Sequence, residues 1–359
     1  MPGDPSTSTG GYIYDGQILA GLAELGWRTR VHSLDASFPR PTPAALRDAR
    51  AQLAALRGDS AIVIDGLALA GLERVLETEA KRLAIVALVH HPLALETGVA
   101  AAEAQRLEAA ERDALAFARR VIVTSQWTAR ALGRYDVPIE RIRVVEPGVD
   151  RRPRRKSRAA RVVTRTLAPP AAEAVRLLCV ATITPRKGHT VLLEALAELR
   201  DRPWQLTCAG SITRDAATFA ALEHQVERLA LRARVRFLGD LDADALEREY
   251  ESADLFVLAS YLEGYGMALA EAVARGVPVV STTAGAIPET VPAAAGVLVP
   301  PGDSRALAKA LGSLLEDAGA RARLAASARA AARKLPTWRM ATEKFAAALD
   351  GVVRPAGTR

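Results

Sequence analysis

Short apolar runs alternate with longer helical patterns along the whole of this 359-residue chain. Each apolar run has about the length of one β-strand, and an amphipathic or alanine-rich helical pattern follows it. This alternation is typical of parallel sheets that are covered by helices on both faces. Because the chain is longer than the size at which one hydrophobic core usually stops growing, we expect two α/β domains of the doubly wound, Rossmann-like type.

The first domain is predicted to occupy residues 1–150. Helices are expected at 44–56 and 101–118, and Pro147 and Gly148 end the series. The apolar runs predict one sheet with strands at 30–34, 61–64, 84–89, 121–124 and 142–145.

The second domain is predicted at 175–335, after a basic linker at 151–174. The last helix, within 336–359, could complete this domain or cross back to the first. Two such domains in tandem predict a cleft between them, because doubly wound sheets bind ligands at their edges. The expected strands are 176–181, 205–209, 235–238, 255–258, 277–281 and 297–299, and the expected helices are 190–199, 215–229, 243–252 and 267–275.

The net charge of +7 is unevenly distributed, because residues 151–165 alone carry eight Lys or Arg residues. This stretch is interpreted as a solvated linker or, alternatively, as a contact for anionic lipid head groups or another polyanion. Nucleic-acid binding is not expected, since only 4% of the residues are aromatic and no recognition motif is present. No apolar run could span a bilayer and the first residues lack a secretory signal. We therefore expect a cytoplasmic protein, free or attached peripherally to the inner face of the membrane.

The two cysteines, Cys179 and Cys208, each lie inside an apolar run that is predicted to be a strand. Buried core thiols are a more common explanation for this pattern than a metal or redox site. The sequence shows no cluster of His, Cys or Asp with metal-ligand spacing, so no metal site is predicted.

The most informative segment, EGYGMALAEAVARGVPVV, begins at Glu263. It follows a strand, passes through a loop with Gly264 and Gly266, and enters a helix that contains Glu271. Glycines let the backbone approach a ligand closely, and the helix start offers unpaired N–H groups to an anion such as a diphosphate. The two carboxylates could accept hydrogen bonds from hydroxyl groups of one ligand. Composition alone fits an ordinary turn of an α/β protein equally well.

This segment, continued as STTAGAIPETV and GVLVPPGD, resembles the donor-site signature of the retaining glycosyltransferases of family 4, which have the GT-B fold. The resemblance covers most of residues 175–315. It extends to ATITPRKGHTVLLEAL, CAGSITRD and VRFLGDLDADALEREYESADLFVLAS. It implies transfer of a sugar from a nucleoside diphosphate sugar, which would be a co-substrate and not a bound cofactor, without a metal ion and with retention at the anomeric carbon.

The resemblance also implies roles for charged residues of the second domain. Arg186 and Lys187 match the basic pair that neutralises the departing diphosphate. Of the two acids, Glu263 matches the residue that contacts the transferred sugar, and Glu271 matches the one that contacts the ribose.

The glycine loop of the second domain matches the family at four further positions, Gly264, Tyr265, Gly266 and Met267. Their backbone groups would meet the diphosphate or the sugar. The side chains of Tyr265 and Met267 are expected to pack in the protein interior.

In the first domain, TGGYIYDGQILAGLAELGWRTRVHSL resembles the glycine loop and first helix beside the donor phosphates and the acceptor. Gly10 and Gly11 are the matching positions. The segment VHHPLALE places two histidines at the carboxyl end of a strand, where such sheets keep their ligands. His90 fits the position of a histidine that contacts the donor sugar slightly better than His91, and Ser125 is a further candidate contact.

One departure from the family concerns the start of the chain. Family members have an apolar strand immediately before the glycine loop, whereas only MPGDPSTST precedes Gly10 here. We therefore expect a first sheet that lacks a central strand, or a chain that begins downstream of its natural start. Either case would weaken the acceptor side of the site.

Three other functions are weighed against sugar transfer. A nucleotide-sugar-binding protein without catalysis would share the site. A dinucleotide-dependent oxidoreductase would need a third glycine where position 269 is Leu. A pyridoxal-phosphate phosphorylase would be much longer. The sequence leaves open the sugar, the nucleotide base, the oligomeric state, and whether the acceptor is a glycan, a lipid-linked or a small molecule.

Overall fold

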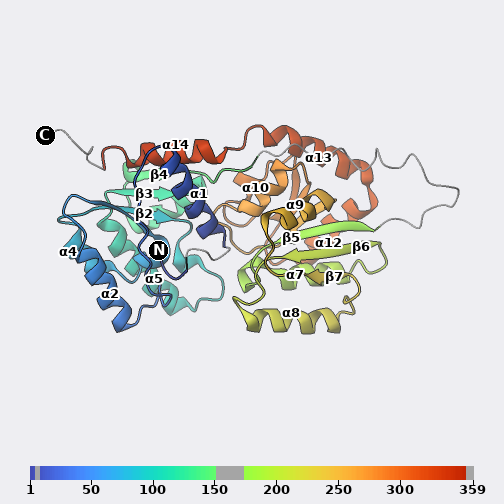
Figure 1. Ribbon diagram of the computed structural model, residues 1–359. Helices are drawn as coiled ribbons and strands as arrows, with labels where there is room; N and C mark the ends of the chain where they lie inside the picture. Colours follow the sequence, from blue (N-terminus) through green and yellow to red (C-terminus); the bar gives the residue numbers. More distant parts are fainter. Residues whose placement is uncertain (5–8, 151–173, 353–359) are drawn as a thin grey trace. The chain divides into compact units, whose positions relative to one another are not determined.

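The computed structural model describes residues 1–4, 9–150 and 174–352. The chain divides into two compact units, which are Met1–Gly148 with Pro336–Arg359 (unit 1) and Val149–Leu335 (unit 2). Each unit is an α/β structure built on a parallel sheet (Figure 1). No helix of the described residues is long and apolar enough to cross a bilayer. The basic stretch 151–165 lies outside the described residues, so its contact with anionic lipids stays a prediction. The cleft expected between the two domains also stays a prediction.

The sheet of unit 1 has four parallel strands in the order β1-β2-β3-β4. All six residues of β2 are buried, as expected for a parallel strand that is covered on both faces. The strands are β1 (Ala61–Asp65), β2 (Ala84–Val89), β3 (Arg120–Val123) and β4 (Ile142–Val144). The helices are α1 (Gly10–Glu24), α2 (Pro43–Ala54), α3 (Gly66–Leu69), α4 (Glu73–Glu79), α5 (Ala101–Ala116), α6 (Gln126–Ala131) and α14 (Trp338–Leu349), with short 3-10 turns η1 (Leu93–Leu95), η2 (Leu132–Tyr135) and η3 (Ile139–Arg141).

The strand predicted at 30–34 is not formed. Within this segment, Leu34 is the only residue in a β-bridge, which is an isolated parallel bridge to Pro2. Val31 is 43% exposed, so the segment buries too little apolar surface to hold a strand in the sheet. Among the described residues before α1, Pro2 is likewise the only position in a β-bridge. Within the described residues, the first sheet therefore has no strand ahead of α1.

Helix α14 packs against α1 and β3, so the C-terminal helix belongs to unit 1 (Figure 1). The contact is close, because a Cβ at Gly21 would lie 2.2 Å from Oγ1 of Thr342. At the start of α14, a Cβ at Gly148 would lie 2.2 Å from the backbone nitrogen of Trp338. Tyr14 of α1 contacts the Trp338 ring edge to face, with ring centroids 6.1 Å apart. Small residues thus let this helix complete the unit.

The sheet of unit 2 has six parallel strands in the order β10-β9-β8-β5-β6-β7. The order reverses between β5 and β8, which is the topological switch point of a Rossmann-type sheet. All strands predicted for this half are present within two residues of their expected ends. They are β5 (Val175–Val180), β6 (Trp204–Ala209), β7 (Val235–Phe237), β8 (Leu255–Leu258), β9 (Val279–Thr282) and β10 (Gly296–Val299).

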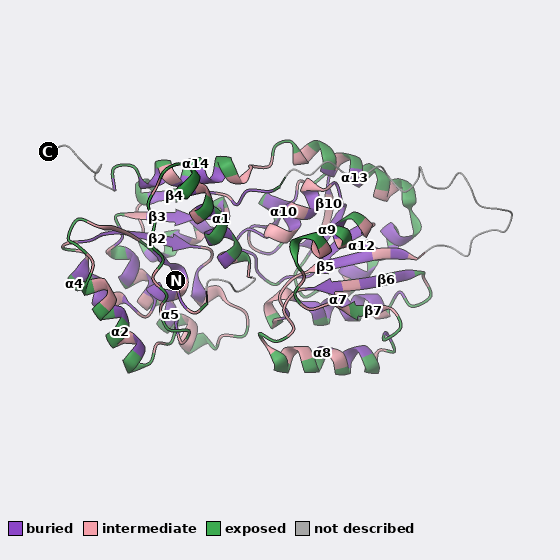
Figure 2. Ribbon diagram, in the orientation of Figure 1, coloured by how far each residue is buried: buried purple, intermediate pink, exposed green. Residues whose placement is uncertain are grey.

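The helices of unit 2 cover both faces of its sheet, and their outer faces are exposed while the strands are mostly buried (Figure 2). Aspartate side chains cap α8, α9, α12 and α13 by accepting a hydrogen bond from a backbone N–H group of the first turn. The elements are η5 (Pro185–Lys187), α7 (His189–Ala197), α8 (Ala216–Arg228), α9 (Ala243–Ser252), α10 (Met267–Ala274), α11 (Ile287–Thr290), α12 (Ser304–Glu316) and α13 (Ala318–Ala332).

The substitution Gly21→Ala is expected to destabilise unit 1, because the new Cβ would meet both branches of Thr342, at 2.2 and 2.9 Å. Such overpacking costs about 1–3 kcal/mol, against a gain of about 1 kcal/mol for replacing a helical glycine. The matched variant Gly16→Ala, on the same helix, has open space around it and should gain about 0.5–1 kcal/mol. Urea unfolding midpoints measure both changes, and shifts of the same sign would contradict the packing of α1 on α14.

Candidate functional site

The loop after β5 carries the predicted basic pair. Arg186 and Lys187 lie in the turn η5, which ends at Gly188. Gly188 has a φ of 66°, and a Cβ there would lie 2.0 Å from the carbonyl oxygen of Ala259, so this position requires glycine. The backbone N–H of Tyr261 donates to the carbonyl oxygen of Arg186 at 2.8 Å. These contacts hold the loop after β5 against the segment that follows β8.

Glu263 lies in the loop after β8 and is 5% exposed. Its Oε1 accepts hydrogen bonds from Lys187 Nζ at 2.7 Å and from Ser260 Oγ at 2.6 Å. The Arg186 guanidinium lies 3.7 Å from Oε2 and donates to the carbonyl oxygen of Leu262 at 2.8 Å. The structure therefore brings the predicted Glu263, Arg186 and Lys187 together as one charged cluster.

This cluster lies at the carboxyl ends of β5 and β8, the two strands between which the strand order reverses. Doubly wound sheets bind ligands at this point, because the loops diverge there and leave a crevice. Burial raises the pKa of Glu263, but Lys187 and Arg186 outweigh it and hold the pKa below its usual range. Glu263 is therefore ionised at neutral pH, and the three side chains together carry one net positive charge.

The first turn of α10 follows Glu263 directly. Gly266 precedes the helix with a φ of 90°, and a Cβ there would lie 2.8 Å from the side chain of Leu269. The first N–H groups of a helix, here from Met267 onward, have no acceptor within the helix and favour an anion. This backbone conformation is compatible with the contacts to a diphosphate or sugar that were predicted for Gly264 and Gly266. Those contacts stay a prediction.

The side chain of Tyr265 is buried, and that of Met267 is partly buried. Tyr265 is 8% exposed and lies in an apolar cluster with Val149 and Ala270, against which Met267 packs. The carbonyl oxygen of Tyr265 accepts a hydrogen bond from Thr290 Oγ1 at 2.5 Å. This packing fixes the backbone of the glycine loop.

Glu271 projects from α10 and is held by Tyr250, whose hydroxyl lies 3.0 Å from its Oε2. Arg275 stacks on the Tyr250 ring, 4.5 Å from the centroid, and is paired with Glu247 at 2.7 Å. Burial raises the pKa of Glu271, while Arg275 and the Tyr250 hydroxyl oppose this rise. No sequence pattern identified Tyr250, because it lies on α9 and reaches Glu271 only through helix packing.

In unit 1, the predicted Gly10 and Gly11 are the first residues of α1 and not a separate loop. A Cβ at Gly11 would lie 3.4 Å from the ring of His90, at ordinary contact distance, so the ring lies directly beside the first turn of α1. Nε2 of His90 lies 3.4 Å from Asp15 Oδ1 and 3.8 Å from Asp65 Oδ2. The sequence analysis missed both aspartates, which come from α1 and from the end of β1.

His91 and Ser125 have other partners. Nε2 of His91 lies 3.3 Å from a carboxylate oxygen of Glu96. Ser125 is the N-cap of α6 and is buried, and its Oγ accepts a hydrogen bond from the backbone N–H of Thr128 at 3.0 Å. Ser125 thus caps α6, and its suggested ligand contact stays a prediction. His90 differs from His91 in its buried carboxylate partners.

Cys179 and Cys208 are buried free thiols, as predicted, and they are paired side by side in β5 and β6. Nε2 of His189 lies 3.6 Å from Cys179 Sγ. The hydrogen bond from Cys208 lowers the pKa of Cys179, burial opposes this, and His189 adds to the lowering. The donor atoms of this trio, and those of Asp15, Asp65 and His90, lie close enough to hold a metal ion. Sequence spacing missed both groups, because strand pairing and helix packing create them.

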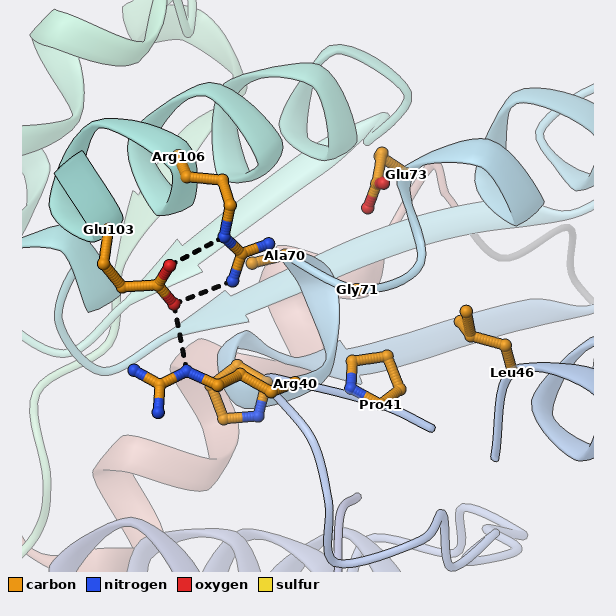
Figure 3. A pocket seen from close by; sticks show the side chains of 9 residues that line it. Arg40, Pro41, Leu46, Ala70, Gly71, Glu73, Glu103 and Arg106 are labelled. Atoms are coloured by element: carbon orange, nitrogen blue, oxygen red, sulfur yellow. Dashed lines mark hydrogen bonds and ion pairs between the residues drawn. The ribbon is translucent and has the colours of Figure 1, made fainter. Parts of the chain in front are cut away.

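Unit 1 also has an open depression that contains none of the predicted site residues (Figure 3). Glu103 lies in it and binds Arg106 and Arg40, with Nε to carboxylate distances of 2.8 and 2.9 Å. Hydrogen bonds from Arg106 and Arg40 lower the pKa of Glu103 to about 2. None of the predicted site residues lines this depression, whereas the switch point of unit 2 brings three of them together, so the switch point is the stronger candidate site.

Comparison with known proteins gives family matches for both units. Residues 15–152 match the family described as Glycosyltransferase Family 4, and residues 169–331 match Glycosyl transferases group 1. The chain is 36% identical over 236 residues to D-inositol 3-phosphate glycosyltransferase of Salinispora tropica, covering 62% of this chain and 49% of that protein. It is 29% identical to MMP alpha-(1->4)-mannosyltransferase of Mycolicibacterium hassiacum, covering 89% and 77%. The chain spans about half the length of the first of these relatives.

Solved structures share the fold over nearly the whole chain. Sucrose-phosphate synthase from Thermosynechococcus elongatus superposes with a TM-score of 0.77 at 25% identity, covering 96% of this chain and 95% of that chain. HepE of Anabaena, solved with UDP and glucose, superposes with a TM-score of 0.73 at 21% identity, covering 98% of both chains. With two parallel-sheet units, a charged cluster at the switch point of unit 2, and family matches in both halves, the chain belongs to the group 1 glycosyltransferases of the GT-B fold.

Proposed function

We propose that this chain transfers a sugar from a nucleoside diphosphate sugar to an acceptor, with retention at the anomeric carbon. The observation that carries the proposal is the cluster in which Lys187 and Arg186 flank the buried carboxylate of Glu263. Membership in the glycosyltransferase family supports sugar transfer as the reaction. The acceptor class stays open between a glycan, a lipid-linked molecule and a small molecule.

The cluster suits the departure of a diphosphate. The bond between the sugar and the phosphate oxygen breaks, and negative charge develops on that oxygen. Lys187 and Arg186 are already fixed by Glu263 and by the carbonyl oxygen of Leu262, so they need little reorganisation to stabilise this charge. The first N–H groups of α10 would add a second anion-binding element.

The two glutamates would bind different parts of the donor. Glu263 is ionised and would accept hydrogen bonds from hydroxyl groups of the sugar, while Glu271, oriented by Tyr250, would accept them from the ribose. His90 of unit 1 would contribute a further contact to the sugar.

Retention would follow from attack of the acceptor hydroxyl on the same face of the sugar that the diphosphate leaves, with the departing phosphate oxygen taking the proton. We also propose that transfer needs no metal ion, because the cations of Lys187 and Arg186 occupy the place where a metal would otherwise neutralise the diphosphate. Cytoplasmic location, with or without peripheral attachment through residues 151–165, is part of the same proposal.

Replacing Lys187 by Gln should lower turnover of the preferred donor by about 100-fold or more, since one preorganised charge on the leaving group is lost. A panel of nucleotide sugars, assayed by release of the nucleoside diphosphate, identifies that donor and measures kcat. Lys309→Gln, an exposed lysine of α12, is the matched control and should leave kcat unchanged. Equal kcat values for Lys187→Gln and the wild type would contradict the role of the cluster.

The variant Glu263→Gln separates a catalyst from a protein that only binds nucleotide sugars. A catalyst should lose about 100-fold in kcat, because the carboxylate that orders Lys187 is gone, yet calorimetry should still detect the donor complex. The exposed Glu194 of α7 gives the control Glu194→Gln. A wild-type protein that binds a donor and turns over none with any acceptor would favour the binding function.

Metal independence is checked with a chelator. Transfer from the preferred donor should proceed at the same rate after EDTA treatment and in added manganese. Loss of activity in EDTA that manganese restores would show that a cation takes part and would contradict this part of the proposal.

A further inference from the structure

His90 is placed by three segments of unit 1. It follows β2, and its ring lies beside Gly11 in the first turn of α1. Asp15 comes four residues after Gly11, so both face the same side of α1. The ring of Tyr14 meets the His90 ring edge to face, with centroids 5.5 Å apart. One nitrogen of the ring, Nε2, is thereby directed at carboxylates.

The two carboxylates are almost completely buried. Asp15 is 5% exposed and Asp65 is 3% exposed. Neither oxygen of Asp15 accepts a hydrogen bond, whereas Asp65 Oδ1 accepts one from the backbone N–H of Leu67 at 2.7 Å as the N-cap of α3. A buried carboxylate without hydrogen bonds is costly unless an opposite charge compensates it. His90, 3.4 Å from Asp15 and 3.8 Å from Asp65, supplies that charge when it is protonated.

Charged and titratable groups face His90 from several elements of unit 1. Asp15 and Tyr14 face it from α1, Asp65 from the end of β1, and the amino group of Met1 lies near both aspartates. Burial lowers the pKa of His90, but the adjacent carboxylate of Asp15, together with the charge of Asp65, raises it above its usual value of 6.5. Burial raises the pKa of Asp65, and the charge of His90 opposes this rise.

The second ring nitrogen, Nδ1, has no hydrogen-bond partner among the described residues. In the neutral ring with Nε2 protonated, Nδ1 can only accept a hydrogen bond, whereas in the imidazolium it donates one. The two aspartates therefore decide which function Nδ1 has.

We propose that Asp15 and Asp65 are positioning residues that hold His90 as an imidazolium, with Nε2–H between their carboxylates and Nδ1–H free to donate a hydrogen bond to an oxygen of the bound sugar. This inference rests on the proposed sugar transfer for its substrate, but the contact within unit 1 does not. Neither aspartate touches the substrate; both act through His90.

The protonation state of His90 is measured in the full chain by NMR, from the pH dependence of its ring signals. The chain has only five histidines, so the signal that disappears in His90→Gln identifies His90. The wild type should titrate above 6.5, and Asp15→Asn should lower the pKa of His90 by about one unit or more. Asp113→Asn, an exposed aspartate of α5, is the control and should leave it unchanged.

Activity gives the second readout. Because His90 would act while protonated, activity and the ion pair are retained below its pKa and lost as pH rises through it. In Asp15→Asn the alkaline limb of the kcat profile should therefore move to lower pH by the same shift that NMR measures. Asp65→Asn serves as a second variant, since asparagine also caps a helix and preserves α3. Circular dichroism verifies that each variant is folded.

An unchanged pKa of His90 in folded Asp15→Asn and Asp65→Asn overturns the positioning role. A lowered pKa without movement of the alkaline limb overturns the donor role of Nδ1. A lowered pKa in a protein that turns over no nucleotide sugar supports the contact between the aspartates and His90, and it contradicts the proposed function instead.

Discussion

The hydrogen-bonded ion pair between Lys187 and Glu263 connects the two loops on which the site of unit 2 depends. The loops follow β5 and β8, which are adjacent in the sheet. The two paired residues are nevertheless 76 positions apart in the sequence. Each charge alone would be costly to bury, so each requires the other in place. The pair therefore fixes both the backbone of the switch point and the charges that a diphosphate would meet.

Glycines make this pairing possible. Gly188 has no room for a side chain beside Ala259, and a Cβ at Gly285 would lie 2.2 Å from the carbonyl oxygen of Glu263. Both have positive φ values, which side-chain-bearing residues rarely adopt. Close backbone approach thus brings three loops together at one edge of the sheet, and the helix α10 begins directly beside them.

Much of the fold could be predicted, because the strands of unit 2 are short, continuous apolar runs that are buried on both faces. The segment 30–34 (RVHSL) is less apolar than those runs and lacks a neighbouring strand, and it stays at least partly exposed. Strand formation there depends on a pairing partner that local sequence does not report. Likewise, the motif identified Glu263, Arg186 and Lys187, whereas the roles of Tyr250 and Asp15 appear only when helices pack.

The sequence was sufficient to predict the two α/β units, the family, and the charged positions Arg186, Lys187 and Glu263, because local periodicity and ordered motifs encode these features. Only the tertiary structure decided that α14 completes unit 1, that Glu263 is paired with the basic residues, and that His90 lies between two buried aspartates. These facts depend on contacts between residues distant in sequence. Such contacts are set by packing and by the need to compensate buried charges, which no local pattern expresses.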